Sequence, residues 1–309
     1  MDEGQAAGRG RPWQRLLPGL SSELLDPETL KGAWYMTSAT LSYQGDMLKR
    51  RLRGQVEVDA WGLDADLLES IRPALNFFYK YYWRIETNGI ENIPAYGPAV
   101  LVSYHSGQYG WVAAMIMSAV FYQHPAQRLV RCLYPRSVGR LPLLPGLLAR
   151  LGQAPAEGEA GAQLLAAGEL ICAFPEVEGS VTRLFRRPYT LPRFGQSDFV
   201  RIALEAGAPL IPTAIVGAEP NFGATLGRLD VTRRIGLANP AALLNPPSLL
   251  PLGAPPLPTR WKIAFGPPLE LAEAKTGLAA DRTQHSRLAD EVRAALQGLL
   301  DAQLARAGR

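Results

Sequence analysis

The chain has 309 residues, of which 47% are hydrophobic and 19% are charged. This composition allows one large α/β domain with additional elements, and it excludes wholesale disorder. The net charge of +4 is a mild excess held in short basic clusters, at 49–53 and 183–187, rather than in one continuous stripe. We therefore expect no nucleic-acid partner. An anionic membrane surface fits the charge at least as well, and a plain solvated surface is the alternative for each cluster.

Two cysteines, Cys132 and Cys172, lie in apolar runs and have no neighbouring histidine or C-x-x-C partner. They are predicted to be small buried residues in a reducing compartment. The N-terminal sequence does not have the pattern of a secretion signal, and no apolar run reaches the ~18 residues that span a bilayer. The longest run, 111–122, is predicted to be a buried helix. We expect a cytoplasmic protein that, if it acts on lipid, does so from the inner face of the cytoplasmic membrane.

Residues 1–30 are rich in Gly, Pro and Arg and are predicted to be a flexible tail. Residues 30–53 are predicted to form a helix that ends in basic residues. Its apolar members follow a poor period, so membrane docking by this helix stays a hypothesis; they are Trp34, Tyr35, Met36, Leu41 and Leu48. Residues 64–83 are predicted to form an amphipathic helix with aromatic anchors.

From residue 84 onward, short apolar runs alternate with helical patterns. Strands are predicted at 84–87, 99–104, 128–134, 169–175, 208–217 and 262–271. Helices are predicted at 111–122, 158–168, 198–207 and 283–306. Gly168 is predicted to close the second, and Gly207 to be the left-handed stop of the third. The Pro/Leu-rich segment 238–259 is predicted to be a packed irregular loop. This alternation predicts an α/β fold with a largely parallel central sheet flanked by helices.

Among the three histidines, His105 stands apart because it follows the buried strand that ends in VLVSY and precedes a helix. Ligands of open α/β sheets bind beyond the carboxyl ends of strands, and a neutral imidazole there can act as a general base. Core filling is an equally good interpretation of this position taken alone. His124 and His285 lie in polar surroundings and are predicted to be surface residues.

A second strand end adds further polar groups. ELICAFP delivers Phe174, Pro175 and Glu176, which are followed by Gly179 and by three arginines, Arg183, Arg186 and Arg187. A parallel sheet could place this end beside His105, and arginine forks match the geometry of a phosphate. A solvated basic turn remains the alternative, more for Arg187 than for all three arginines.

Four blocks in this order, VSYHSG, FPEVEGS, RLFRRPY and FVRIALEAGAPLIPTAIVGAE, resemble the phospholipid/glycerol acyltransferases of the lysophospholipid-acyltransferase superfamily. The resemblance is strongest to the monoacylglycerol-acyltransferase-like bacterial branch and covers about residues 80–270. It implies an acyltransferase-like α/β domain over 81–309, preceded by a helical extension over 31–80.

The resemblance implies transfer of a fatty acyl group from acyl-CoA or acyl carrier protein to a glycerolipid hydroxyl, without a cofactor or a metal. His105 matches the catalytic base, Glu176 matches the Phe-Pro-Glu-Gly block, and the three arginines would hold the acceptor's phosphate. The remaining residues implied to line the substrate pocket are Ser106, Gly107, Phe174, Pro175, Gly179 and Pro212. A membrane lipid acceptor and a membrane surface are the implied partners.

The sequence departs from the family where the acid that orients the histidine should stand. The positions at the two family spacings are occupied by Gly110 and Val112, and the Gly of Phe-Pro-Glu-Gly is Val177. Losing the acid of a catalytic triad can cost up to ~10⁴ in rate. The chain is thus predicted to be a slow acyltransferase, an enzyme that uses Glu176, Glu178 or Asp198 instead, or a silent lipid-binding relative.

Other chemistries lack their motifs. Ser106 and Ser180 do not lie in a G-x-S-x-G elbow, which argues against a serine hydrolase. No His/Cys spacing predicts a zinc site, and no G-x-x-x-x-G-K-[ST] loop is present.

Overall fold

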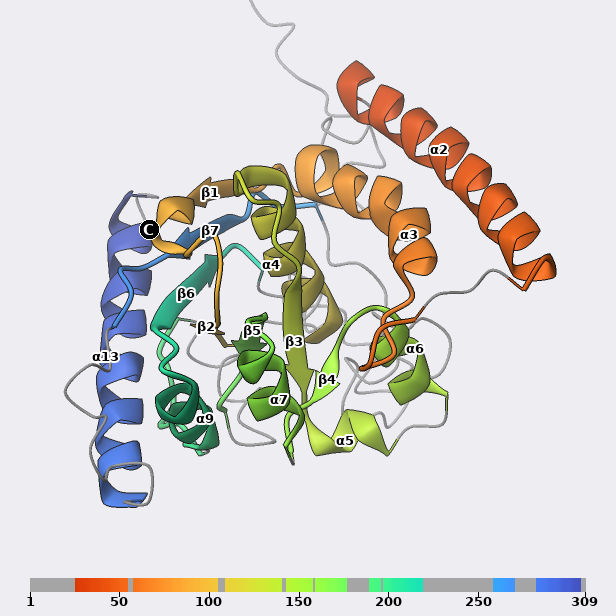
Figure 1. Ribbon diagram of the computed structural model, residues 1–309. Helices are drawn as coiled ribbons and strands as arrows, with labels where there is room; N and C mark the ends of the chain where they lie inside the picture. The colour runs from red at the N-terminus through yellow and green to blue at the C-terminus, as the bar shows by residue number, and fades with distance from the viewer. Residues whose placement is uncertain are drawn as a thin grey trace, which may run out of the picture.

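The computed structural model describes residues 26–54, 58–104, 109–140, 143–157, 159–176, 189–195, 197–218, 258–269 and 282–306. Within these residues a sheet of seven strands runs in the order β1-β7-β6-β2-β5-β3-β4 (Figure 1). The strands are β1 (Glu86–Asn88), β2 (Ala99–Val102), β3 (Val130–Tyr134), β4 (Ala154–Pro155), β5 (Leu170–Ala173), β6 (Leu210–Val216) and β7 (Lys262–Phe265).

The centre of the sheet is parallel, as the sequence predicts. β6, β2, β5, β3 and β4 run in one direction, whereas β7 is antiparallel to β6 and parallel to β1. Every residue of β2, β5 and β6 is buried, because helices cover both faces of the sheet. The predicted α/β fold is therefore confirmed, with one antiparallel contact in an otherwise parallel core.

Helices form a layer on each side of the sheet (Figure 1). One core cluster packs α3, α4 and the π-helical turn η2 against it, and a second packs α7, α9 and α13. A third cluster packs the later part of α13 against β6. The helical segments are α2 (Pro27–Leu52), α3 (Ala65–Phe77), η2 (Phe78–Tyr82), η3 (Ile90–Asn92), α4 (Tyr109–Gln123), α5 (Arg136–Gly139), α6 (Leu144–Arg150), α7 (Ala160–Ala166), α9 (Asp198–Ala206) and α13 (Arg282–Arg306). None of the helices in the described ranges is both long and apolar enough to cross a membrane.

Two predicted helix stops are confirmed by their backbone. Gly207 follows α9 with φ 62°, and Gly168 follows α7 with φ 79°. Both lie in the left-handed region that glycine enters without a Cβ clash. α2 begins at Pro27, slightly before the predicted start of the first helix. Residues 1–25 of the predicted tail and residues 238–257 of the predicted loop lie outside the described residues.

Cys132 and Cys172 are confirmed as buried residues. They stand opposite each other on the neighbouring strands β3 and β5, and both are free thiols. Burial raises the pKa of Cys172 well above its usual value. An uncharged thiol in an apolar core is a poor nucleophile, which agrees with a packing role.

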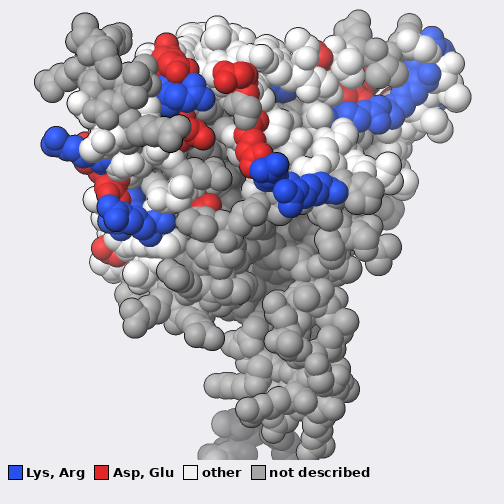
Figure 2. All heavy atoms as spheres, turned by 90° about the horizontal axis from the view of Figure 1, so that it is seen from below, with Lys and Arg blue, Asp and Glu red and all other residues white. Residues whose placement is uncertain are grey.

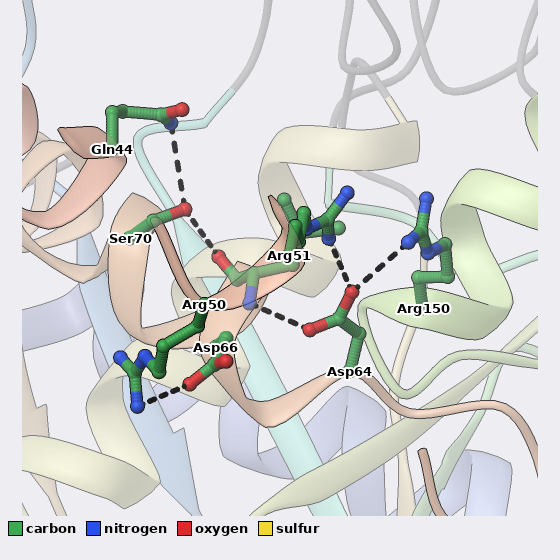
Figure 3. Close-up of polar contacts among 8 residues, drawn as sticks. Gln44, Arg50, Arg51, Asp64, Asp66, Ser70 and Arg150 are labelled. Atoms are coloured by element: carbon green, nitrogen blue, oxygen red, sulfur yellow. Dashed lines mark hydrogen bonds and ion pairs between the residues drawn. The ribbon is translucent and has the colours of Figure 1, made fainter. Parts of the chain in front are cut away.

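The N-terminal helix α2 lies along the outer side of α3 (Figure 1). Asp64 holds α2 and α6 together at the start of α3 (Figure 3). The Asp64 side chain is 1% exposed, accepts a hydrogen bond from Arg51 at 2.5 Å, and forms an ion pair with Arg150 at 3.1 Å. It also caps α3 by accepting a hydrogen bond from the Leu67 amide at 2.9 Å. Because a buried carboxylate is costly unless it is paired, two arginines and an amide make this a firm joint.

Close contact of α2 with η2 depends on Gly32. A Cβ at this position would meet the Tyr81 ring at 2.6 Å, whereas a Cβ at Gly45 of the same helix would meet nothing within 4 Å. We expect Gly32→Ala to lower the free energy of unfolding by roughly 1 kcal/mol, because the ring must move. Gly45→Ala should raise that free energy by up to about 1 kcal/mol through helix propensity. Denaturant unfolding of both variants measures the difference, and equal effects would contradict a close approach of Gly32 to the Tyr81 ring.

Candidate functional site

The carboxyl ends of β2 and β5 lie side by side, as the parallel sheet predicts. Val102 of β2 pairs with Ala173 of β5 on one side and with Pro212 of β6 on the other. The Ser103 amide donates a hydrogen bond to the Ala173 carbonyl at 3.0 Å. The chain therefore enters the segment that begins at His105 next to the point where it leaves β5 toward Phe174 and Glu176.

Two buried hydroxyl groups fix the end of β2 against β6. The Ser103 hydroxyl donates to the Thr213 carbonyl at 2.9 Å, and the Tyr104 hydroxyl donates to the Ile215 carbonyl. Both residues are almost fully buried, so these bonds are shielded from water. They hold the backbone in place immediately before His105. The sequence treats Tyr104 only as the end of an apolar run, and its anchoring role becomes visible only with the fold.

Most predicted site residues lie outside the described part of the chain. These are His105, Ser106, Gly107, Gly179, Arg183, Arg186 and Arg187. Four predicted residues are described, and they lie on or directly after the two strands next to β2. Phe174, Pro175 and Glu176 directly follow β5, and Pro212 lies on β6.

The segment that follows β5 ends in a buried residue, Glu176. Glu176 is 5% exposed. The Pro175 carbonyl accepts a hydrogen bond at 3.0 Å from the Gly195 amide, which ties this turn to the segment before α9. Glu176 is thus a buried carboxylate three residues after the strand that pairs with the end of β2, which keeps it a candidate for the orienting acid.

An apolar cavity of about 110 Å³ lies beside these strand ends. Its walls come from α3, α4, the end of β3, α5 and α6, and apart from Gln153 almost every side chain is apolar. The lining residues are Ile71, Leu75, Gly110, Ala113, Ala114, Met117, Cys132, Leu133, Tyr134, Pro135, Val138, Leu144, Leu148, Leu151, Gln153 and Phe174. The cavity reaches from Phe174 after β5 and Gly110 at the start of α4 into the helical layer, and an alkyl chain fits such surroundings.

A second, more polar hollow of about 240 Å³ is also lined by Phe174. It runs between α7, α9 and the ends of β3 and β5, and its charged members are Glu159, Asp198 and Arg201. Arg201 donates to both carboxylate oxygens of Glu205 at 2.9 Å, and this bond raises the pKa of Arg201. Phe174 after β5 and Leu133 of β3 line both spaces, so the apolar and polar hollows are neighbours at these two residues.

The two positions that could have carried the orienting acid differ in their surroundings. Val112 is 1% exposed and belongs to the core cluster of α4. Gly110 is partly exposed at the start of α4 and lines the apolar cavity. Only Gly110 therefore borders the space beside the strand ends, and an acid at 112 would point into the core.

The other two histidines are buried, so their predicted surface placement is wrong. His124 is 4% exposed; its Nε2 lies 3.0 Å from the Ile93 carbonyl, and its Nδ1 accepts from the Ala126 amide at 3.1 Å. These partners assign the proton to Nε2. His285 is 5% exposed and continues the buried stripe of α13, four residues before Ala289. The i, i+4 spacing between His285 and this stripe is the sequence signal that indicates its burial. The polar residues beside His285 in the sequence hid that signal.

Charge does not single out one partner on the described surface. Figure 2 shows basic and acidic side chains interspersed over the described part of the face seen from below. Within the described ranges, no group of three or more His, Cys, Asp or Glu side chains is arranged to hold a metal ion.

The sequence profile of the family described as Acyltransferase matches residues 84–216, from the start of the sheet to the end of β6. Uncharacterized proteins of Mycobacterium bovis and Mycobacterium tuberculosis are 36% identical over 256 residues, which cover 82% of this chain and 71% of theirs. The chain belongs to the acyltransferase superfamily. An uncharacterized protein of Mycobacterium leprae shares the same identity, with 69% of its length covered.

One solved structure similar to this acyltransferase-superfamily protein is the crystal structure of the 1-acyl-sn-glycerophosphate acyltransferase PlsC from Thermotoga maritima. The alignment covers 89% of this chain and 94% of that chain, with 15% sequence identity and a TM-score of 0.48.

Proposed function

We propose that this protein transfers a fatty acyl group from acyl-CoA or acyl carrier protein to a hydroxyl of a lysophospholipid or another glycerolipid. His105 is the general base in this proposal. What carries it is the junction of the β2 and β5 ends beside an apolar cavity that begins at Gly110 and Phe174. Membership of the acyltransferase superfamily supplies the reaction class.

The proposed step needs no cofactor or metal. His105 takes the proton of the acceptor hydroxyl while the oxygen attacks the thioester carbonyl, a C–O bond forms and the C–S bond breaks. The imidazolium returns its proton to the departing thiolate. Arg183, Arg186 and Arg187 would bind the acceptor's phosphate, and Glu176 would orient the imidazole or the acceptor.

In the same proposal the acyl chain of the donor occupies the apolar cavity. The remaining pocket residues, Ser106, Gly107, Pro175, Gly179 and Pro212, would shape the space around the ester carbon. The protein would work as a peripheral enzyme on the inner face of the cytoplasmic membrane, where the lipid acceptor is found.

A labelled acyl donor incubated with the purified protein and a panel of lysolipids tests this proposal. We expect an acylated glycerolipid product whose amount follows enzyme concentration. The alternative is a silent lipid-binding relative, which the absence of an acid at both family spacings favours. Lipid binding without product from any donor of the panel would support that alternative and contradict the proposed activity.

The cavity assignment predicts a shift in chain length. Ala114 is 7% exposed and lines the cavity, so Ala114→Phe should shorten it. We expect kcat/KM for a long-chain donor to fall roughly tenfold or more relative to a short-chain donor, because each methylene excluded from an apolar pocket is worth about 1–3 kcal/mol.

Leu148→Ala provides the opposing variant, since it enlarges the same cavity from the α6 side. Its preference should move toward longer donors. Parallel kinetics with donors of increasing length give both results. If both variants and the wild type show the same dependence on donor chain length, the cavity does not hold the acyl chain of the donor.

A further inference from the structure

α2 carries an exposed apolar stripe along its whole length. The exposed fractions are 54% for Leu30, 74% for Trp34, 69% for Leu41, 57% for Leu48 and 80% for Leu52. At 3.6 residues per turn these five side chains fall within about 40° of one another around the helix axis. Such a stripe, large and unburied, needs an explanation.

The contacts of α2 with the rest of the protein leave this stripe uncovered by described residues. Thr29 and Gly32 are the buried residues of the helix, and Gln44 and Arg51 bond to Ser70 and Asp64 of the α3 region (Figure 3). These four residues lie on a face centred about a third of a turn from the stripe. The Asp64 joint therefore fixes α2 so that its apolar stripe lies beside the face that contacts α3, and not on that face.

The charges beside the stripe favour an anionic partner. Residues 27–53 contain five basic and two acidic residues, an excess of three positive charges. Lys31 and Lys49 flank the stripe on the same side, and their pairs with Glu28 and Asp46 are highly exposed. Exposed pairs of this kind contribute little, so lipid phosphates can replace the carboxylates.

A second copy of the chain is a poorer match. Trp34, Leu41 and Leu48 repeat every seven residues, as the first apolar position of a coiled coil would. The second apolar position of each repeat, three residues later, is occupied by Thr37, Gln44 and Arg51, and the last two are engaged with Ser70 and Asp64. A two-helix seam would thus lack half of its apolar contacts, whereas a lipid surface needs only one narrow stripe.

We infer that α2 is the membrane-docking surface of this protein and that it lies in the plane of an anionic bilayer with Leu30, Trp34, Leu41, Leu48 and Leu52 inserted. The 26-residue helix would extend over about 39 Å of the surface. The choice of a lipid partner rests on the proposed function, but docking itself requires no turnover.

Environment-sensitive labelling of full-length protein tests the inference. The native thiols are buried, so a single cysteine at Leu41→Cys, on the stripe, or at Tyr43→Cys, elsewhere on the same helix, can be labelled with a fluorophore. Vesicles of phosphatidylglycerol and phosphatidylcholine, without acyl donor or acceptor, should raise and blue-shift the fluorescence at 41 and leave that at 43 nearly unchanged. Equal responses at both positions, or none, would overturn the inference. An apolar signal at 41 before vesicles are added would show that the chain itself or a second copy covers the stripe.

Vesicle sedimentation gives the energetic counterpart. Leu41→Asp/Leu48→Asp should weaken partitioning by at least about tenfold, because two leucine side chains lose their apolar surroundings. Tyr43→Asp adds a negative charge to the same helix and should weaken partitioning much less. Binding should also fall with added salt or without phosphatidylglycerol. If both charged variants bind equally, the stripe is not the docking surface; if docking holds while no acyl product forms, only the proposed reaction fails.

Discussion

Replacing His105 by alanine should lower kcat/KM for acyl transfer by about 10²–10⁴, the range over which a positioned general base contributes. The expectation follows from the residues that precede His105 in the chain. The Ser103 and Tyr104 hydroxyls are hydrogen-bonded to β6, and the Ser103 amide is hydrogen-bonded to Ala173 at the end of β5. Without the imidazole, the acceptor hydroxyl would have to lose its proton to water as it attacks the thioester. Initial rates at subsaturating donor and acceptor measure the loss.

His124→Gln is the matched control for the loss of an imidazole. His124 follows the last residue of α4, whereas the strand ends precede the first residue of that helix. It donates to the Ile93 carbonyl, and glutamine can keep a donor there. This variant should lose about 1 kcal/mol of stability or less and keep its turnover per folded molecule. Unchanged turnover in His105→Ala, with the control behaving as expected, would remove His105 from the chemistry.

Val112→Asp should lower the free energy of unfolding by about 3 kcal/mol or more, because it places a carboxylate without a designed partner in the core. Val112 is 1% exposed and packs within the cluster that includes Trp111 and Met115. Denaturant unfolding measures this loss, with Val112→Ala as the control for lost packing alone. The difference between the two variants is the free-energy cost of the buried charge. Equal stability of Val112→Asp and Val112→Ala would show that an acid at 112 finds a partner.

Gly110→Asp is the variant that asks whether an acid can restore the site. Gly110 is the second residue of α4 and is partly exposed, so the carboxylate would lie near the positive end of the helix dipole. We expect a folded protein whose turnover rises above that of the wild type if a poorly oriented His105 limits the rate. Gly110→Asn has the same size without the charge and should not give this rise. A rise in both variants would point to a change in the cavity wall rather than to an orienting acid.

The short apolar runs predicted the central strands well. β2, β5 and β6 are buried on both faces, and a strand in that position must be continuously apolar. α5, α6 and β4 were not predicted, because the segment 135–155 is interrupted by Pro and Gly and its strand is only two residues long. That segment nevertheless supplies Leu144, Leu148 and Leu151 to the cavity, so the sequence could not reveal the cavity.

The sequence by itself determined the parallel α/β core, the helix stops at Gly168 and Gly207, and the motifs that mark the acyltransferase superfamily. These features depend on neighbours in the chain, through side-chain period, backbone freedom and local spacing. Only the tertiary structure decided that Val112 faces the core while Gly110 faces the cavity, and that His124 and His285 are buried. It also decided that none of the described residues covers the stripe of α2. Each of these outcomes depends on which distant segment of the chain packs against the residue. Burial and pairing with such segments set the free energy of placing a side chain in the core or at the surface.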